Sequence, residues 1–169
     1  RRSSDLKSPK IYINGTGCVS TQSFDPRGTI QVFSKAEGNR MQAIEPDYKI
    51  LLPPIQLRRM SKVVKMGIAA AKTALQDAAI NNPDIIITGT GYGCLADTEA
   101  FLQKMISQNE SLLTPTAFIQ STHNTVSGQI ALMLTCHGHN FTYVQRGLSF
   151  EFALQESMIT RVGADKDIK

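Results

Sequence analysis

One segment of the chain could present a reactive group at the start of a helix. Residues 142–144 are the strand formers Thr, Tyr and Val, and Gly147 permits a strained turn. Ser149 can cap a helix, which the pattern predicts over residues 150–162. A strand that bends sharply into a helix presents one side chain where free backbone N–H groups and the helix dipole favour negative charge. A nucleophile would suit that bend, but the segment contains no cysteine.

Histidine and cysteine side chains elsewhere are the other candidates for catalysis or metal binding. His123 and Asn124 lie in a Ser/Thr/Asn cluster, where a histidine more commonly makes structural hydrogen bonds than does chemistry. Cys136 and His137 are adjacent, so their side chains point in different directions, and no second ligand cluster lies elsewhere in the sequence. We therefore expect no metal site.

A glycine-rich loop raises the question of nucleotide binding. Residues 89–93 read Gly-Thr-Gly-Tyr-Gly and follow the β-branched run 84–88, which predicts a buried parallel strand. The glycine spacing differs from the dinucleotide-binding motif, and no Lys-Ser/Thr pair follows as it does in a phosphate-binding loop. We therefore expect no nucleotide and no other cofactor.

Composition describes an ordinary globular protein. The 169 residues are 41% hydrophobic and 19% charged, which suits about one domain with a real core. Apart from Arg58-Arg59 the basic residues are scattered and the net charge is only +4, so nucleic-acid binding is not indicated. The widely spaced Cys18, Cys94 and Cys136 favour free thiols in a reducing cytoplasm. No apolar run reaches membrane-spanning length, and no signal peptide is visible.

Predicted strands alternate with predicted helices along the chain. The expected elements are a buried strand at 11–13, an irregular stretch at 21–54, a helix at 62–79, a strand at 84–88, a helix at 98–108, a connector at 111–120, a helix from 121 or 122 to about 135, and then the bend described above. This order indicates a layered α/β fold with a mixed or mostly parallel sheet between helices. Residues 1–10 are interpreted as a mobile leader, and residues 11–169 as one domain.

The predicted helices carry specific packing expectations. Small residues such as Gly67 indicate that the helix over 62–79 packs closely against a sheet or another helix. In the helix over 98–108, we expect Phe101, Leu102 and Met105 to be buried. Gly128 costs about 1 kcal/mol relative to alanine inside a helix, so we expect it to let a neighbouring element approach closely.

Four stretches resemble, in the same order, the first half of β-ketoacyl synthases, which condense acyl chains. They are Gly15-Thr16-Gly17 with Val19-Ser20 after the first strand, Arg58-Arg59-Met60-Ser61 before an alanine-rich helix, the glycine-rich loop followed by Asp97 and Glu99, and Asn140-Phe141-Thr142 before the bend. The resemblance runs from about Ile11 to the end. It implies the N-terminal half of a thiolase-like fold.

The resemblance also implies that covalent catalysis is lost at the bend. In that family the nucleophilic cysteine stands five residues after the threonine, and five residues after Thr142 stands Gly147. Glycine cannot be acylated, so we assign no catalytic residue here. The family's two catalytic histidines belong to its second half. The chain is thus similar to the chain-length-factor partners of polyketide or aryl-polyene synthases, which also lack the cysteine.

Pocket and partner residues follow from the same resemblance. The bend residues, which we call the elbow, would lie near a shared pocket and are Arg146, Gly147, Leu148 and Ser149. His123 and Asn124 would lie on the helix near the acyl pocket and dimer contact. The strand that would pair with a partner's equivalent across a two-fold axis consists of Phe141, Thr142, Tyr143, Val144 and Gln145. The implied partners are a second copy or a cysteine-containing synthase, together with acyl carrier protein.

Two alternatives remain open at this point. The first is an active 3-oxoacyl-[acyl-carrier-protein] synthase or acyltransferase that uses Ser149, Cys94 or groups in a second half. The second is an α/β ligand-binding module unrelated to acyl chemistry, which would be a monomer that does not bind acyl carrier protein.

Overall fold

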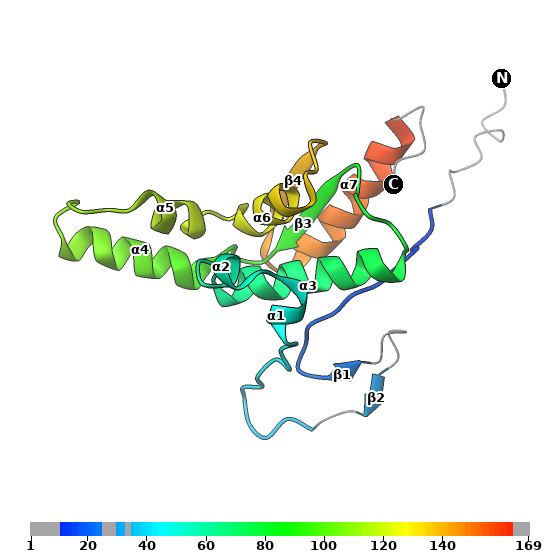
Figure 1. Ribbon diagram of the computed structural model, residues 1–169, viewed down its shortest axis with the longest axis horizontal. Helices are drawn as coiled ribbons and strands as arrows, with labels where there is room; N and C mark the ends of the chain where they lie inside the picture. The colour runs from blue at the N-terminus through cyan, green and yellow to red at the C-terminus, as the bar shows by residue number, and fades with distance from the viewer. Residues whose placement is uncertain (1–10, 25–29, 33–34, 164–169) are drawn as a thin grey trace.

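The computed structural model describes residues 11–24, 30–32 and 35–163 (Figure 1). Its elements are β1 Ser23–Phe24, β2 Ile30–Val32, α1 Tyr48–Leu51, α2 Pro54–Leu57, α3 Lys62–Asp77, β3 Ile86–Thr90, α4 Leu95–Ser107, α5 Pro115–Ser121, α6 Thr125–Leu134, β4 Asn140–Val144, a 3₁₀ turn Arg146–Leu148, and α7 Ser149–Gly163. The leader predicted for residues 1–10 lies outside the described ranges.

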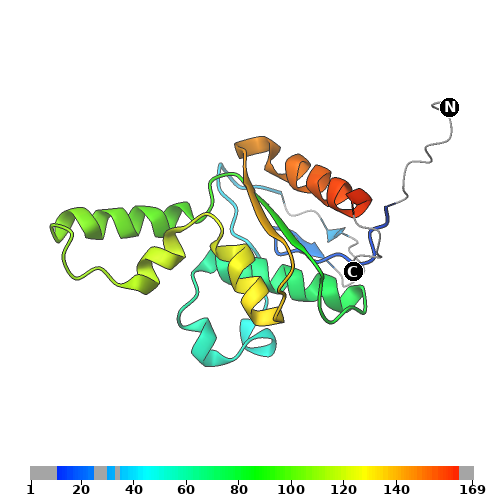
Figure 2. The ribbon, with the colours of Figure 1, turned by 90° about the horizontal axis from the view of Figure 1, so that it is seen from above.

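The central sheet of the described chain pairs β3 with β4 in parallel. Ile86 lies opposite Asn140, and Thr90 lies opposite Val144. Helix α7 covers one face of this sheet, α6 covers the other, and α3 packs behind α6 (Figure 2). The predicted layered α/β arrangement, with a parallel sheet between helices, is therefore confirmed. A separate antiparallel pair joins β1 and β2.

A small apolar core lies between the sheet and the helices on the α6 side. Val64 and Ile68 are 1% and 0% exposed, one helical turn apart on α3, and they cluster with Leu52, Ile86 and Ile130. Burying each such side chain contributes about 1.5–3 kcal/mol. This core fixes α3 and α6 beneath the strands that lead to the elbow.

Glycine at position 67 lets α3 and α6 approach closely, as the sequence predicts. A Cβ there would come 2.5 Å from Cγ1 of Val126 on α6. Our expectation for Gly128 is wrong, because a Cβ at that position would meet nothing within 4 Å. Only the first of these two helical glycines is explained by packing.

Helices α4 and α5 form a hairpin that extends away from the sheet (Figure 2). The connector predicted at 111–120 is partly wrong, because Pro115 begins α5 and the Thr114 hydroxyl accepts a hydrogen bond from the Ala117 N–H. The Phe101 and Phe118 rings meet edge to face at 5.8 Å across the hairpin. Leu102, predicted to be buried, is 43% exposed because α4 packs mainly against this one neighbour.

Two further predictions differ from the structure. Residues 11–13 form no strand, and Ile13 is 84% exposed. The chain instead runs over α3, where the Thr16 N–H donates to Asp77 at 2.9 Å and the neighbouring glycines contact the helix backbone. The helix predicted from 121 or 122 begins only at Thr125, whose hydroxyl donates to the Ile119 carbonyl at 2.6 Å across a break between α5 and α6.

Candidate functional site

The elbow is a 3₁₀ turn that joins the end of β4 to the start of α7. Arg146 has a φ of 52°, which places an ordinary side-chain residue in the left-handed region. The Leu148 N–H closes the turn by donating to the Gln145 carbonyl at 3.1 Å. The backbone strain of this bend is thus held at Arg146, a conformation that costs about 1–2 kcal/mol for a residue with a Cβ.

Gly147 does not serve the turn as a strained glycine, contrary to our expectation. Its φ is not positive, and a Cβ at this position would meet no atom within 4 Å. Gly147 is exposed, at the tip of the bend. The fold would therefore accept a side chain here, and glycine is not required by the backbone geometry.

Ser149, predicted to cap α7 from just before the helix, is instead the first residue of α7, and its hydroxyl bonds to the elbow and to β3. Its side chain is buried, with 4% of the residue exposed. Its Oγ accepts the Gln145 N–H at 2.9 Å and lies 2.8 Å from the Arg146 carbonyl oxygen. The same hydroxyl lies 2.7 Å from the Thr90 carbonyl oxygen at the end of β3. One hydroxyl group thus links both strand ends to the first turn of α7.

Gly89 near the end of β3, and Gly91 in the loop that follows, allow this part of the chain to lie against the elbow. A Cβ at Gly89 would collide with the Ser149 carbonyl oxygen, and one at Gly91 would lie 3.5 Å from the Arg146 carbonyl oxygen. Gly93, with a φ of 66°, places its backbone against His123, so that an added Cβ would lie 2.8 Å from the His123 Cα. The loop after β3 therefore packs against both the elbow and His123, just before α6.

Comparison with known proteins identifies the family. The model of the β-ketoacyl synthase N-terminal domain matches residues 33–162. The chain belongs to the β-ketoacyl synthase family. No curated protein sequence matches the chain at a significant level.

Solved ketosynthases share the fold of this domain. A chain of the complex between the ketosynthase ApeO and its chain length factor ApeC, from Xenorhabdus doucetiae, is 19% identical with a TM-score of 0.58, and the match covers 84% of the present chain. A β-ketoacyl synthase from Burkholderia phymatum STM815 is 15% identical with a TM-score of 0.57 over 91% of the chain. The match spans only 51% and 38% of those two longer chains. The fold is thus that of a thiolase-like N-terminal domain.

In this ketosynthase-like domain, the two faces of strand β4 contact different helices. Thr142 faces α6, where its hydroxyl lies 2.9 Å from the Ser127 hydroxyl. Tyr143 faces α7, donates to Glu156 at 2.7 Å and stacks on Phe152. The hydrogen bond to Glu156 raises the pKa of Tyr143. Both contacts tie β4 to the helices that sandwich it.

The outer edge of β4 is unpaired within the described ranges, since β3 is its only neighbour there. Phe141 and Val144 are 38% and 41% exposed on this strand. Gln145 lies just beyond the end of β4 and belongs to the elbow turn. The predicted pairing strand is therefore a short edge with apolar side chains.

The predicted pocket residues His123 and Asn124 are exposed at the start of α6. Asn124 occupies the N-cap position without a side-chain capping bond. His123 contacts the same loop as the elbow does, at Gly93. His123 and the elbow thus pack against the same loop. His123 and Asn124 do not line the cavities found between the described helices.

No cysteine lies at the elbow of the domain. Cys94, at the start of α4, is 2% exposed, and burial, with a smaller effect of the Asp97 charge, raises the pKa of its thiol. Cys18 is exposed at the other end of the described chain, and Cys136 packs against the core. The His139 ring stacks on the Phe141 ring, with the two centroids 5.7 Å apart. Within the described ranges, no three His, Cys, Asp or Glu side chains gather into a possible metal cluster.

Sequence reasoning missed the strained Arg146 and the bond between Ser149 and β3. Gly89 and Gly91 are the signal in the sequence that could have indicated a close neighbour for the chain at the end of β3. The helices contained in the described ranges include none long and apolar enough to cross a bilayer.

Proposed function

We propose that this domain is a ketosynthase-like subunit that forms no covalent acyl intermediate at its elbow. It works beside a cysteine-containing ketosynthase in fatty-acid or polyketide-type biosynthesis, with aryl-polyene assembly as the narrower form of the proposal. The observation that supports this proposal most is Gly147. It lies at the tip of an intact elbow, where there is room for a side chain but the residue has none. In this proposal the backbone N–H of Gly147 binds a carbonyl or anionic group of the ligand.

The two alternative nucleophiles are poorly placed for acylation, which supports the non-covalent role. The Ser149 hydroxyl is buried and lies within hydrogen-bonding distance of three backbone groups. The Cys94 thiol is buried and its pKa is raised, so little reactive thiolate forms at neutral pH. Neither group is open to an acyl group delivered on a carrier protein.

The free edge of β4 supports the proposed pairing with a partner. An unpaired strand edge carries backbone groups that can extend a sheet into a second chain. The exposed Phe141 and Val144 would add apolar contacts at that junction. One of the fold relatives was solved as a ketosynthase in complex with its chain length factor. We also propose a cytoplasmic location, supported by the three free thiols.

Light scattering on mixtures tests this proposal. The domain, alone and mixed at micromolar concentration with a cysteine-containing ketosynthase, is separated by size and its mass is measured. We expect a mixed dimer, and we expect Val144→Lys to weaken it by placing a charge on the strand edge. Persistent separate peaks, with the domain monomeric throughout, would contradict the proposed pairing with a ketosynthase. Labelling by a radioactive acyl-carrier substrate at Ser149 or Cys94 would favour the active enzyme.

A further inference from the structure

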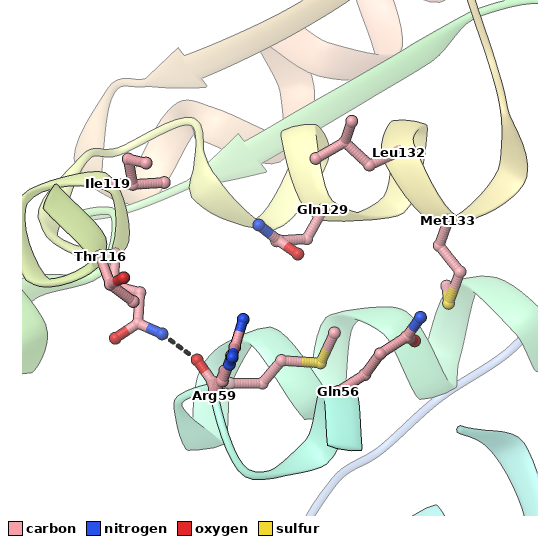
Figure 3. A pocket seen from close by; sticks show the side chains of 9 residues that line it. Gln56, Arg59, Thr116, Ile119, Gln129, Leu132 and Met133 are labelled. Atoms are coloured by element: carbon pink, nitrogen blue, oxygen red, sulfur yellow. Dashed lines mark hydrogen bonds between the residues drawn. The ribbon is translucent and has the colours of Figure 1, made fainter. Parts of the chain in front are cut away.

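A cavity separate from the elbow opens between α2, α5 and α6 (Figure 3). Its volume is about 330 Å³, and its walls combine one cation, amide groups and apolar side chains. We propose that this cavity binds a small organic carboxylate with a short aliphatic body. Gly147 is not among its lining residues, and the inference does not rest on the proposed function.

Arg59 supplies the group that would recognise the carboxylate. Figure 3 shows its side chain reaching from the end of α2 into the space below Gln129. Within the described ranges its guanidinium has no acidic partner, and no carboxylate lines the cavity. A guanidinium binds a carboxylate through two parallel, charge-assisted hydrogen bonds.

Amide groups around Arg59 would orient the same ligand. Gln56 approaches from α2 and Gln129 from α6, on opposite sides of the space (Figure 3). The Gln120 amide is already engaged, because it donates to the Arg59 backbone carbonyl. That bond joins α5 to the turn after α2 and so holds the wall that carries the guanidinium.

The rest of the cavity is suited to an aliphatic body. Met60, just before α3, and Met133, near the end of α6, are half-buried and line it, together with Ile119 on α5. Thioether side chains are flexible and polarizable, so they can close around chains of different shape. A volume near 330 Å³ lies at the lower end of the range for small-molecule sites, which suits a small ligand with a short chain.

Titration of the whole chain with hexanoate tests the inference, with the methyl groups of the methionines enriched in carbon-13. Two methionines, Met60 and Met133, line the cavity, and the other four serve as internal references: Met41, Met66, Met105 and Met158. We expect saturable shifts of the first two signals and none of the references. Hexylamine has the same body and the opposite charge, and we expect it to cause no saturable shift.

Two matched arginine variants test whether the charge that binds hexanoate is that of Arg59. We expect Arg59→Gln to weaken hexanoate binding by about tenfold or more, because it removes a charge-assisted pair of hydrogen bonds. Arg58→Gln alters the net charge equally but leaves the cavity intact, and we expect a change of less than about threefold. Equal binding of hexanoate and hexylamine, no shift of either cavity methionine, or equal effects of the two variants would each overturn the inference. The comparison of the two ligands decides the question on the wild-type chain alone.

Discussion

The Ser149 hydroxyl lies 2.7 Å from the Thr90 carbonyl oxygen, so one side chain joins the start of α7 to the end of β3. Its remaining contacts, to the Gln145 N–H and the Arg146 carbonyl, hold the left-handed residue of the elbow in place. None of these contacts involves position 147. The elbow therefore keeps its shape whether or not a nucleophile stands at its tip.

Replacing Ser149 with alanine should destabilise the fold by about 1–3 kcal/mol, because its buried hydroxyl no longer links the Gln145 N–H with the Thr90 and Arg146 carbonyls. Urea unfolding followed by circular dichroism measures this difference. Ser157→Ala is the matched control, since that exposed hydroxyl donates to the Leu154 carbonyl of its own helix, and it should change stability by less than about 0.5 kcal/mol. Equal effects of the two variants would contradict the role given to Ser149.

Gly147→Cys should fold normally, because the added Cβ meets no atom within 4 Å and the backbone is not left-handed. We expect its stability to lie within about 0.5 kcal/mol of the wild type. The new thiol should react rapidly with a maleimide, since it is exposed at a helix start, where the thiolate is favoured. Gly89→Cys is the contrasting variant, because its side chain would collide with the Ser149 carbonyl. A Gly147→Cys thiol that reacts as slowly as Cys94 would show that the elbow is closed.

The two helical glycines should respond oppositely to alanine. Gly67→Ala should lower the free energy of unfolding by about 1–3 kcal/mol, because its Cβ meets Val126, whose branched side chain has little rotamer freedom in a helix. Gly128→Ala should raise it by about 0.5–1 kcal/mol, because alanine is the better helix former and the space is open. Thermal or urea unfolding of both variants gives the answer. A stabilised Gly67→Ala would mean that α3 and α6 are less tightly packed than described.

Alkaline pH should weaken the fold through Cys94. Burial raises the pKa of its thiol above the ordinary 9.0, so the unfolded chain loses this proton at lower pH than the folded chain does. The stability linked to the proton is fully present below pH 9.0 and is lost as the pH rises through the raised value. Urea midpoints on either side of that pH, compared between wild type and Cys94→Ala, measure the effect. Identical pH dependence in the two proteins would contradict it.

The sequence predicted the parts of this fold that depend on local pattern. Helix α3 follows from the spacing of Val64 and Ile68, and β3 from the β-branched run at residues 84–88, which begins two residues before the observed strand. The strand expected at 11–13 fails because a strand needs a neighbour, which pattern alone does not supply. Helix α5 was missed although Thr114-Pro115 is a recognisable cap and first helical position.

The position of the candidate site could be predicted from the sequence, but the hydrogen bonds and the backbone strain that shape it could not. The elbow and Gly147 follow from strand and helix signals together with the family's motif order. The strain at Arg146 depends on hydrogen bonds between Ser149 and residues far along the chain, such as Thr90, so no local signal indicates it. The cavity beside Arg59 likewise arises only when α2, α5 and α6 are brought together.

In the proposed function, this domain takes part in acyl chemistry without bonding to the acyl group. The most direct measurement incubates it with a cysteine-containing ketosynthase and a radioactively labelled acyl carrier protein, then separates the chains under denaturing conditions and counts the label on each. We predict label on the partner synthase alone, and none on this chain. Label bound covalently to this chain, at Ser149, Cys94 or any other residue, would contradict the account.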